Sequence, residues 1–174
     1  MATWNIDTAH SEVQFKVKHM VISTVTGAFK DFNGELVSEQ DNLDNAKINL
    51  AIDVNSIDTR NEARDGHLKS ADFFSADEFP NINVNVESIS KKSDDEYVLH
   101  SKVTIKGTEK SVDFKAEYGG VITDPYGNQR MGLEVSGNLN RQEFGLTWSA
   151  LTEAGGLVVS DDIRLVGNME FVKG

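Results

Sequence analysis

Hydrophobic and polar residues alternate at every second position over most of this chain. Because successive side chains of a β-strand point to opposite faces, this period of two predicts strands with one apolar face and one wet face. Such strands are typical of antiparallel sheets that wrap one core, whereas strands buried on both faces are continuously hydrophobic. The alternation is found at residues 13–17, 48–54, 82–86, 99–105, 112–118, 131–139 and 163–171.

Turn-forming residues separate these stretches, for example at Asn33-Gly34, Gly119-Gly120 and the run from Asp124 to Asn128. This spacing of strands and turns predicts an antiparallel barrel or sandwich. The 14 glycines suit the bulges and corners of a strongly coiled sheet. The chain of 174 residues has the length of one domain, so residues 1–174 are expected to form a single unit.

One segment, near residues 59–79, departs from the alternation. Residues 59–62 read Thr-Arg-Asn-Glu, which has the Thr-x-x-Glu form of a capping box, and they predict a helix that runs to about Lys69. Phe73, Phe74 and Phe79 follow in a compact connector. In an all-β chain, a single helical excursion of this kind is expected to cover a barrel end or a sheet edge.

Charge and cysteine content narrow the function. The net charge of -11 repels phosphate backbones, so no nucleic-acid partner is expected. The absence of cysteine excludes disulfides, cysteine-bound metals and a thiol nucleophile. His10, His19 and His100 are scattered and lack the short spacing of a zinc site, so no metal is expected.

The location is predicted from two observations. The N-terminus has no basic segment followed by an apolar core, and no apolar run reaches the length that spans a membrane. The sequence as written therefore predicts a cytoplasmic protein without an integral membrane segment. A periplasmic location would follow if a signal peptide had been removed.

Motifs of catalysis are missing from the sequence. There is no Gly-x-Ser-x-Gly elbow, phosphate loop or dinucleotide fingerprint. Asp161 and Asp162 are adjacent on a predicted strand, so their carboxylates point to opposite faces. No spacing of serine, histidine and aspartate implies a triad. The sequence therefore predicts a protein that is not an enzyme and that has no cofactor.

A set of short motifs follows in order along nearly the whole chain, and this ordered set resembles the YceI-like family. The motifs are Trp4-x-Ile6-Asp7-x-x-His10-Ser11-x-Val13-x-Phe15-x-Val17-x-His19, Gly27-x-Phe29-x-x-Phe32-x-Gly34, Ser56-Ile57-x-Thr59, Arg64-Asp65-x-His67-Leu68, Asp72-Phe73-Phe74, Phe79-Pro80, Val103-Thr104-Ile105-Lys106-Gly107-Thr108-x-Lys110, Asn140-Arg141-x-x-Phe144-Gly145-x-x-Trp148 and Ser160-Asp161-Asp162-Ile163.

The resemblance implies an all-β fold, an extended eight-stranded antiparallel lipocalin-like barrel. It also implies that a long polyisoprenoid or similar amphipathic lipid is held in an apolar pore, and that the chain could pair as a homodimer. Such a lipid could be a quinone precursor or a prenyl phosphate. Candidate residues for the pore wall combine the inward faces of the predicted strands with the aromatic residues of the motifs. They are Phe15, Val17, His19, Phe29, Phe32, Leu50, Ile52, Phe73, Phe74, Leu139, Phe144 and Trp148.

Arg60, Arg64 and His67 are candidates for binding a polar head group. On a helix they would share one face, and guanidinium groups bind oxyanions bidentately. The alternative is that Arg64 pairs with a carboxylate and pins the helix to the barrel. For Arg141, a structural salt bridge that closes the barrel is expected.

Three functions stay open at this point. The first is a lipid carrier or store. The second is an enzyme that acts on such a lipid, which needs two titratable groups inside the pore, with His19 as the first residue to consider. The third is an interaction module with a solidly packed barrel, whose acidic surface carries the function. An eight-stranded barrel either fills itself with side chains or holds one small ligand, so alternation alone does not choose among them.

Overall fold

The computed structural model describes residues 2–19, 23–39, 42–146 and 159–174. This part of the chain forms eleven strands, one α-helix and three short 3-10 helices. The strands are β1 (Ala2–Ile6), β2 (Glu12–His19), β3 (Ser23–Phe29), β4 (Phe32–Ser38), β5 (Lys47–Asp53), β6 (Ile57–Asp58), β7 (Asn81–Lys91), β8 (Glu96–Ile105), β9 (Thr108–Thr123), β10 (Gln129–Asn140) and β11 (Val159–Lys173). The helices are η1 (Thr8–His10), η2 (Val54–Ser56), α1 (Glu62–Lys69) and η3 (Arg141–Phe144).

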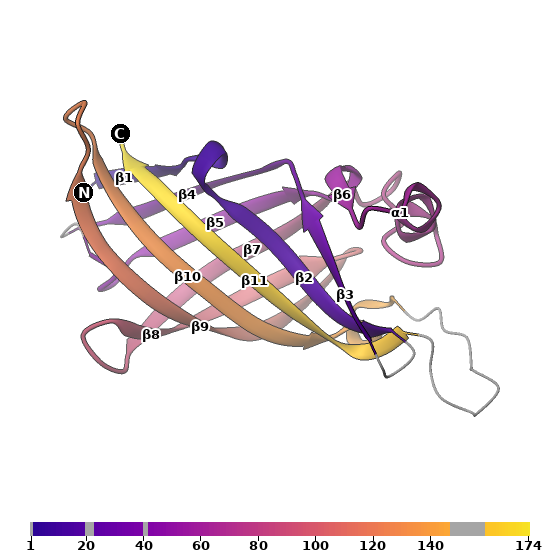
Figure 1. Ribbon diagram of the computed structural model, residues 1–174. Coiled ribbons are helices and arrows are strands. Elements are labelled where there is room, and N and C mark those ends of the chain that lie inside the picture. The colour runs from indigo at the N-terminus through magenta and orange to yellow at the C-terminus, as the bar shows by residue number, and fades with distance from the viewer. Residues whose placement is uncertain (1, 20–22, 40–41, 147–158) are drawn as a thin grey trace.

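All strand pairs are antiparallel, and the sheet closes on itself (Figure 1). Three of the barrel's strands are broken in two, as β1–β2 at η1, β3–β4 at Lys30-Asp31 and β5–β6 at η2. When each broken strand is counted once, eight remain, in the order of the sequence. The last strand, β11, returns to the first, because it pairs with β2 over one half and with β1 over the other. The predicted eight-stranded antiparallel barrel is therefore confirmed.

The helical excursion lies at one end of the barrel. Strand β6 pairs with β3, and β7 pairs with β5, so the chain from β6 to β7 leaves the sheet. It forms α1 and a connector over residues 70–80 before it re-enters the barrel at β7 (Figure 1). Phe73 and Phe74 of this connector are buried in the common core, as expected of a segment that covers a barrel end.

The predicted capping box at residues 59–62 is wrong. The N-cap of α1 is Asn61, whose side chain accepts the Arg64 amide at 3.0 Å, and Glu62 is already the first helical residue. Arg60 takes a left-handed conformation with φ of 65°, and its amide donates to Asp58 at 2.8 Å. This reversal places Thr59 outside the helix start. The predicted end of the helix at Lys69 is confirmed.

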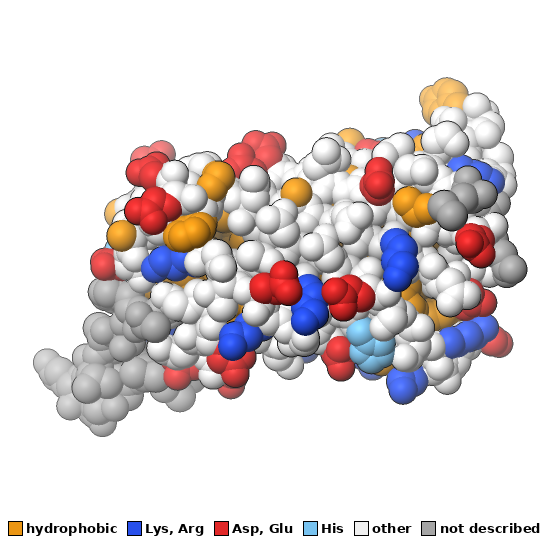
Figure 2. All heavy atoms as spheres, turned by 180° about the vertical axis from the view of Figure 1, so that it is seen from behind, with side chains coloured by type: hydrophobic (Ala, Val, Ile, Leu, Met, Phe, Trp, Pro, Cys, Tyr) orange, Lys and Arg blue, Asp and Glu red, His pale blue; other side chains and the backbone are white. Residues whose placement is uncertain are grey.

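The two faces of the barrel wall differ as the alternation requires. Inward residues of every long strand belong to one hydrophobic cluster, which includes the fully buried Trp4, Val103 and Phe171. On the outer face shown in Figure 2, acidic and basic side chains are interspersed and hydrophobic ones are scattered. Within the described ranges, no helix combines the length and hydropathy needed to cross a membrane.

Candidate functional site

Two apolar cavities lie inside the barrel. The helix-end chamber lies next to α1 and its connector, and the second chamber lies farther along the same strands. The helix-end chamber is lined by Phe15, Val17, Phe29, Ile52, Leu68, Phe73, Phe74, Ile82, Ile105, Leu139, Arg141, Leu146, Ile163 and Leu165. The second chamber is lined by Val13, Ile48, Leu50, Ile52, Val84, Val86, Leu99, Phe114, Val135, Leu165, Val166, Gly167 and Met169.

The two chambers follow one another along the barrel. On β2, Val17 and Phe15 line the helix-end chamber and Val13 lines the second. Ile52 on β5 and Leu165 on β11 belong to both linings. The two chambers therefore adjoin at these two residues.

The chambers are narrow and hydrophobic. Each has a cavity volume of about 60 Å³, and the space between the walls, open ends included, is about 660 Å³ in the helix-end chamber and 580 Å³ in the second. A cavity of 60 Å³ exceeds what a water molecule needs, but water is retained only where two or more polar groups hold it. The hydrocarbon lining favours an apolar guest over water.

Most of the predicted wall residues do line the chambers. Phe15, Val17, Phe29, Phe73, Phe74 and Leu139 line the helix-end chamber, Leu50 lines the second, and Ile52 lines both. Aromatic rings form part of the wall of the helix-end chamber. The ring centroid of Phe29 lies 5.5 Å from that of Phe15 and 6.2 Å from that of Phe74. Their burial alone does not establish ligand contact, so their binding role stays a prediction.

Four predicted wall residues stand apart. Phe32 and Phe144 are buried but belong to neither lining, so they pack the core. The backbone of His19 ends β2, while its side chain and the whole of Trp148 lie outside what the structure describes. The remaining lining residues were not proposed individually, although alternation places those on strands inward. Leu68, Arg141 and Leu146 lie off the strands and had no such indication.

Of the three predicted head-group residues, Arg64 and His67 lie on α1, and Arg60 does not. Arg60 precedes the N-cap and has a positive φ. Arg64 donates to the hydroxyl of the buried Thr59 at 2.8 Å and to the Thr59 carbonyl at 2.6 Å. His67 contacts Asp72 at 2.9 Å. The predicted face of three residues is therefore wrong at Arg60, because the helix begins later than predicted.

The alternative role for Arg64, a structural one, agrees better with these contacts. Thr59 also donates its hydroxyl and its amide to Asp65, at 2.5 and 2.9 Å. Arg64 and Asp65, both on α1, thus hold Thr59 from two sides and fix the helix to the end of β6. The partner of Arg64 is a hydroxyl and a carbonyl rather than the predicted carboxylate.

Arg141 makes the predicted salt bridge. Its side chain is 1% exposed, and its Nη2 lies 3.4 Å from Asp161 at the start of β11. The Nη1 atom donates to the Leu146 carbonyl at 2.6 Å. Burial lowers the pKa of the guanidinium, and the Asp161 carboxylate opposes this shift. Arg141 thus carries a buried charge beside the helix-end chamber, whose lining is hydrocarbon.

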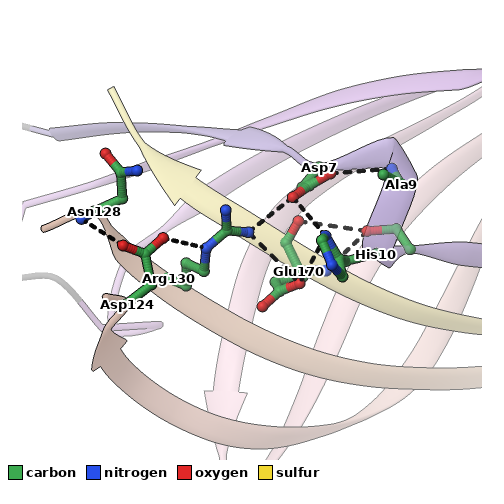
Figure 3. Close-up of polar contacts among 8 residues, drawn as sticks. Asp7, Ala9, His10, Asp124, Asn128, Arg130 and Glu170 are labelled. Atoms are coloured by element: carbon green, nitrogen blue, oxygen red, sulfur yellow. Dashed lines mark hydrogen bonds and ion pairs between the residues drawn. The ribbon is translucent and has the colours of Figure 1, made fainter. Parts of the chain in front are cut away.

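A second polar network lies near the other end of β11, around Arg130 (Figure 3). Arg130 on β10 donates to Asp7 and to Asp124, each at 2.8 Å, and lies 3.7 Å from Glu170. His10 contacts Asp7 at 2.9 Å. The hydrogen bonds from Arg130 and His10 lower the pKa of Asp7 to about 2. This network joins β10 and β11 to the turn between β1 and β2.

One arrangement on the outer face was not expected from the sequence. Ser90 contacts His100 Nε2 at 2.8 Å, and His100 Nδ1 contacts Asp113 at 2.9 Å. The order of contacts matches a Ser-His-Asp triad, which no spacing in the sequence indicated. The side chains of His100 and Asp113 are 40% and 67% exposed, and neither chamber includes any of the three.

The fold and the chambers define the class of this protein, a lipocalin-like barrel with an apolar interior. The comparisons with known proteins are more specific. A profile of the YceI-like domain matches residues 4–171, and the chain belongs to the YceI-like family.

Members of this family match the chain over most of its length. A UPF0312 protein of Staphylococcus aureus (strain USA300) is 34% identical over 172 residues, which cover 98% of each chain. A YCEI protein of Campylobacter jejuni is similar in structure, with a TM-score of 0.78 and 29% identity over 89% of this chain and 88% of that one.

Two more distant structures share the fold. Burkholderia cenocepacia BcnA has a TM-score of 0.82 at 19% identity and covers 95% of this chain and 98% of its own. A polyisoprenoid binding domain from Saccharophagus degradans, implicated in plant cell wall breakdown, has a TM-score of 0.72 at 15% identity and covers 98% of both chains.

Proposed function

We propose that the protein binds a polyisoprenoid or a similar long-chain amphipathic lipid in the two chambers, and that it carries, stores or sequesters this lipid without chemical change. The observation that carries the proposal is the continuity of the hydrocarbon lining past Ile52 and Leu165. The description of the Saccharophagus degradans neighbour as a polyisoprenoid binding domain supports it.

The energetics favour a long apolar tail. Each methylene group that leaves water contributes roughly 0.8 kcal/mol, so several isoprene units outweigh the entropy lost when a flexible chain is held. A tail can enter the narrow cavities only if the walls move apart, and we expect partly buried wall residues such as Val17, Leu50 and Ile163 to move. Slow exchange of the bound lipid is expected.

The direct test is native mass spectrometry of freshly purified protein, followed by organic extraction and identification of what is released. A stoichiometric isoprenoid or long-chain lipid is the expected result. If the measured mass is that of the protein alone, titration with a prenyl alcohol shows whether the barrel can bind a lipid. Saturable binding would support the proposal, whereas no binding would indicate a barrel that serves as a packed interaction module.

Gly27 provides a second test, because its Cα faces the Phe15 ring across the β2–β3 pair. A methyl group at position 27 would overlap that ring and push it into the helix-end chamber. We expect Gly27→Ala to weaken prenyl alcohol binding about tenfold in a fluorescence titration. Gly132→Ala is the matched control, because no atom lies within 4 Å of its added methyl group. Equal affinity in the two variants would argue against a ligand beside Phe15.

The reactivity of Ser90 tests the proposal that the protein binds its lipid without catalysis. The side chains of His100 and Asp113 beside Ser90 are exposed to solvent, and the backbone amides of β8 and β9 take part in the regular pairing of these two strands. Triad enzymes instead work in sites with free amides that bind an oxyanion. We therefore expect a fluorophosphonate probe to leave Ser90 unmodified in peptide mass spectrometry. Labelling that is lost in His100→Ala would contradict the proposal and favour an enzyme.

Cytoplasmic location and a homodimer also belong to the proposal and stay predictions. Cell fractionation tests the cytoplasmic location. Sedimentation velocity over a range of concentrations tests the homodimer. A monomer at all concentrations would remove the homodimer and leave the lipid site unchanged, since both chambers are built from one chain.

A further inference from the structure

The hairpin between β9 and β10 differs from the rest of the exposed surface. Among the large hydrophobic side chains that the structure describes, the two exposed ones, Ile122 and Tyr126, both lie on this hairpin, and they are 63% and 89% exposed. Pro125 precedes Tyr126 in the turn. Exposed hydrophobic residues that are scattered singly need no explanation, but two on one hairpin indicate a surface that contacts a partner.

The hairpin projects from the end of the barrel that lies away from α1 (Figure 1). Strand β8 begins at Glu96, opposite Glu117, so it does not accompany the later part of β9. On the other side, the pairing of β10 with β11 ends at Arg130, opposite Val172. The hairpin tip, residues 123–129, therefore extends past both neighbouring strands. In Figure 2, which shows the molecule from behind, hydrophobic side chains form the outermost point of this projection.

The hairpin tip presents no free charge, although the chain has a net charge of -11. Between Glu117 and Arg130, the one charged residue is Asp124. Its side chain is 9% exposed and accepts a hydrogen bond from Arg130 Nε at 2.8 Å, so its charge is paired and shielded from the solvent. The β7–β8 turn at the same end of the barrel, residues 92–95, has three charged residues instead. The repulsion that keeps an acidic surface away from membranes is therefore weakest at the hairpin tip.

The backbone N–H groups of the hairpin tip are satisfied within the turn. The Asp124 carboxylate accepts the amides of Tyr126 and Asn128, each at 2.9 Å. The Gly127 amide donates to the Asp124 carbonyl at 3.1 Å, and the Asp124 amide donates to the Asn128 carbonyl at 2.8 Å. Pro125 has no amide hydrogen. Because an unpaired N–H group is costly in a medium without water, this internal pairing suits a turn that enters the surface of a bilayer.

We propose that the hairpin tip docks the protein on a lipid bilayer, with Ile122 and Tyr126 inserted at the level of the lipid head groups. The choice of partner rests on the proposed function, because a prenyl lipid resides in bilayers. The size of the tip agrees with this choice. A buried tyrosine contributes about 150–250 Å², so the two residues together stay well below the roughly 800 Å² per partner of a stable protein interface. Tyrosine is also enriched where membranes meet water.

The test is flotation of the full chain with phosphatidylcholine vesicles. The wild type is expected to float with the vesicles, and the partition coefficient of the double variant Ile122→Thr, Tyr126→Ser should be at least about tenfold lower. Asp94→Ser, at an exposed position of the β7–β8 turn, is the matched control and should partition like the wild type. Because the chain has a net charge of -11, phosphatidylglycerol in the vesicles should lower the partition of the wild type at low salt.

A wild type that stays free of the vesicles, or a double variant that floats equally well, would overturn the inference. If the wild type does not float but forms a dimer that the double variant loses in sedimentation velocity, the tip contacts a second copy of the chain instead. Titration with a prenyl alcohol without vesicles separates docking from the lipid site, because neither Ile122 nor Tyr126 lines a chamber. The wild type and the double variant should bind the alcohol equally. Flotation of a wild type that does not bind the alcohol would contradict the proposed function and not the docking.

Discussion

Replacing Phe15 with aspartate is expected to abolish lipid binding. The Phe15 ring is 7% exposed, lines the helix-end chamber and packs on Phe29. A carboxylate in its place would face hydrocarbon, and burying it beside a prenyl tail costs several kcal/mol. Titration with a prenyl alcohol should show an affinity at least about 100-fold lower than that of the wild type.

The control is Gln14→Asp, which adds the same charge one residue earlier, on the other face of β2. It should keep the affinity of the wild type. Circular dichroism decides whether each variant is folded. If Phe15→Asp is unfolded, Val17→Asp takes its place, because Val17 lines the same chamber and is only half-buried. If a folded variant bound the prenyl alcohol with the affinity of the wild type, the ligand would not contact this wall of the helix-end chamber.

The sequence predicted the barrel because the determinant of the fold is repeated in every strand. Val13, Phe15 and Val17 all face inward on β2, and each belongs to a chamber lining, as alternation requires. Where one residue departs from the alternation, the residues on either side still indicate which face of the strand points inward. The chambers themselves could not be predicted, because the same pattern describes a barrel filled by its own side chains.

Single conformational choices were less predictable. Thr59 and Asn61 compete as N-caps, and Asn61 is selected because Arg60 adopts a positive φ that the Asp58 side chain supports. As a result, Arg60 lies outside the helix and apart from the predicted helix face of Arg64 and His67. The break at residues 30–31 was not predicted either, and it places Phe29 at the end of β3 and Phe32 at the start of β4.

Contacts across strands depend on register, which the sequence does not specify. His100 reaches Ser90 only because the pairing of β7 with β8 shifts between Val86 and Ser88. Asp113 stands directly opposite His100 on β9. Arg141 and Asp161 are similarly joined by the pairing of β10 with β11. These contacts were therefore found from the structure.

Asp7→Asn is expected to destabilise the fold, because Asp7 connects the β1–β2 turn to Arg130 on β10 and to His10. Its side chain is 18% exposed and Arg130 is 20% exposed, so solvent weakens the interaction. A loss of about 1–2 kcal/mol in the free energy of unfolding at pH 7 is expected from urea titration. Asp31→Asn changes the net charge equally at an exposed position of the β3–β4 break and should have little effect.

The pH dependence of this loss identifies its cause. Because the pKa of Asp7 is about 2 in the folded protein and 3.8 ordinarily, the folded state holds the ionised form more strongly than the unfolded state does. The stabilisation is complete above the ordinary value and disappears as the pH falls toward 2. Asparagine cannot titrate, so the difference in unfolding free energy between wild type and Asp7→Asn should vanish between about pH 4 and pH 2. Asp124 and Asp58 also have lowered pKa values, so both proteins lose stability in acid and only their difference reports on Asp7. A difference that persists unchanged at pH 2 would mean that Asp7 acts through the shape of the turn and not through its charge.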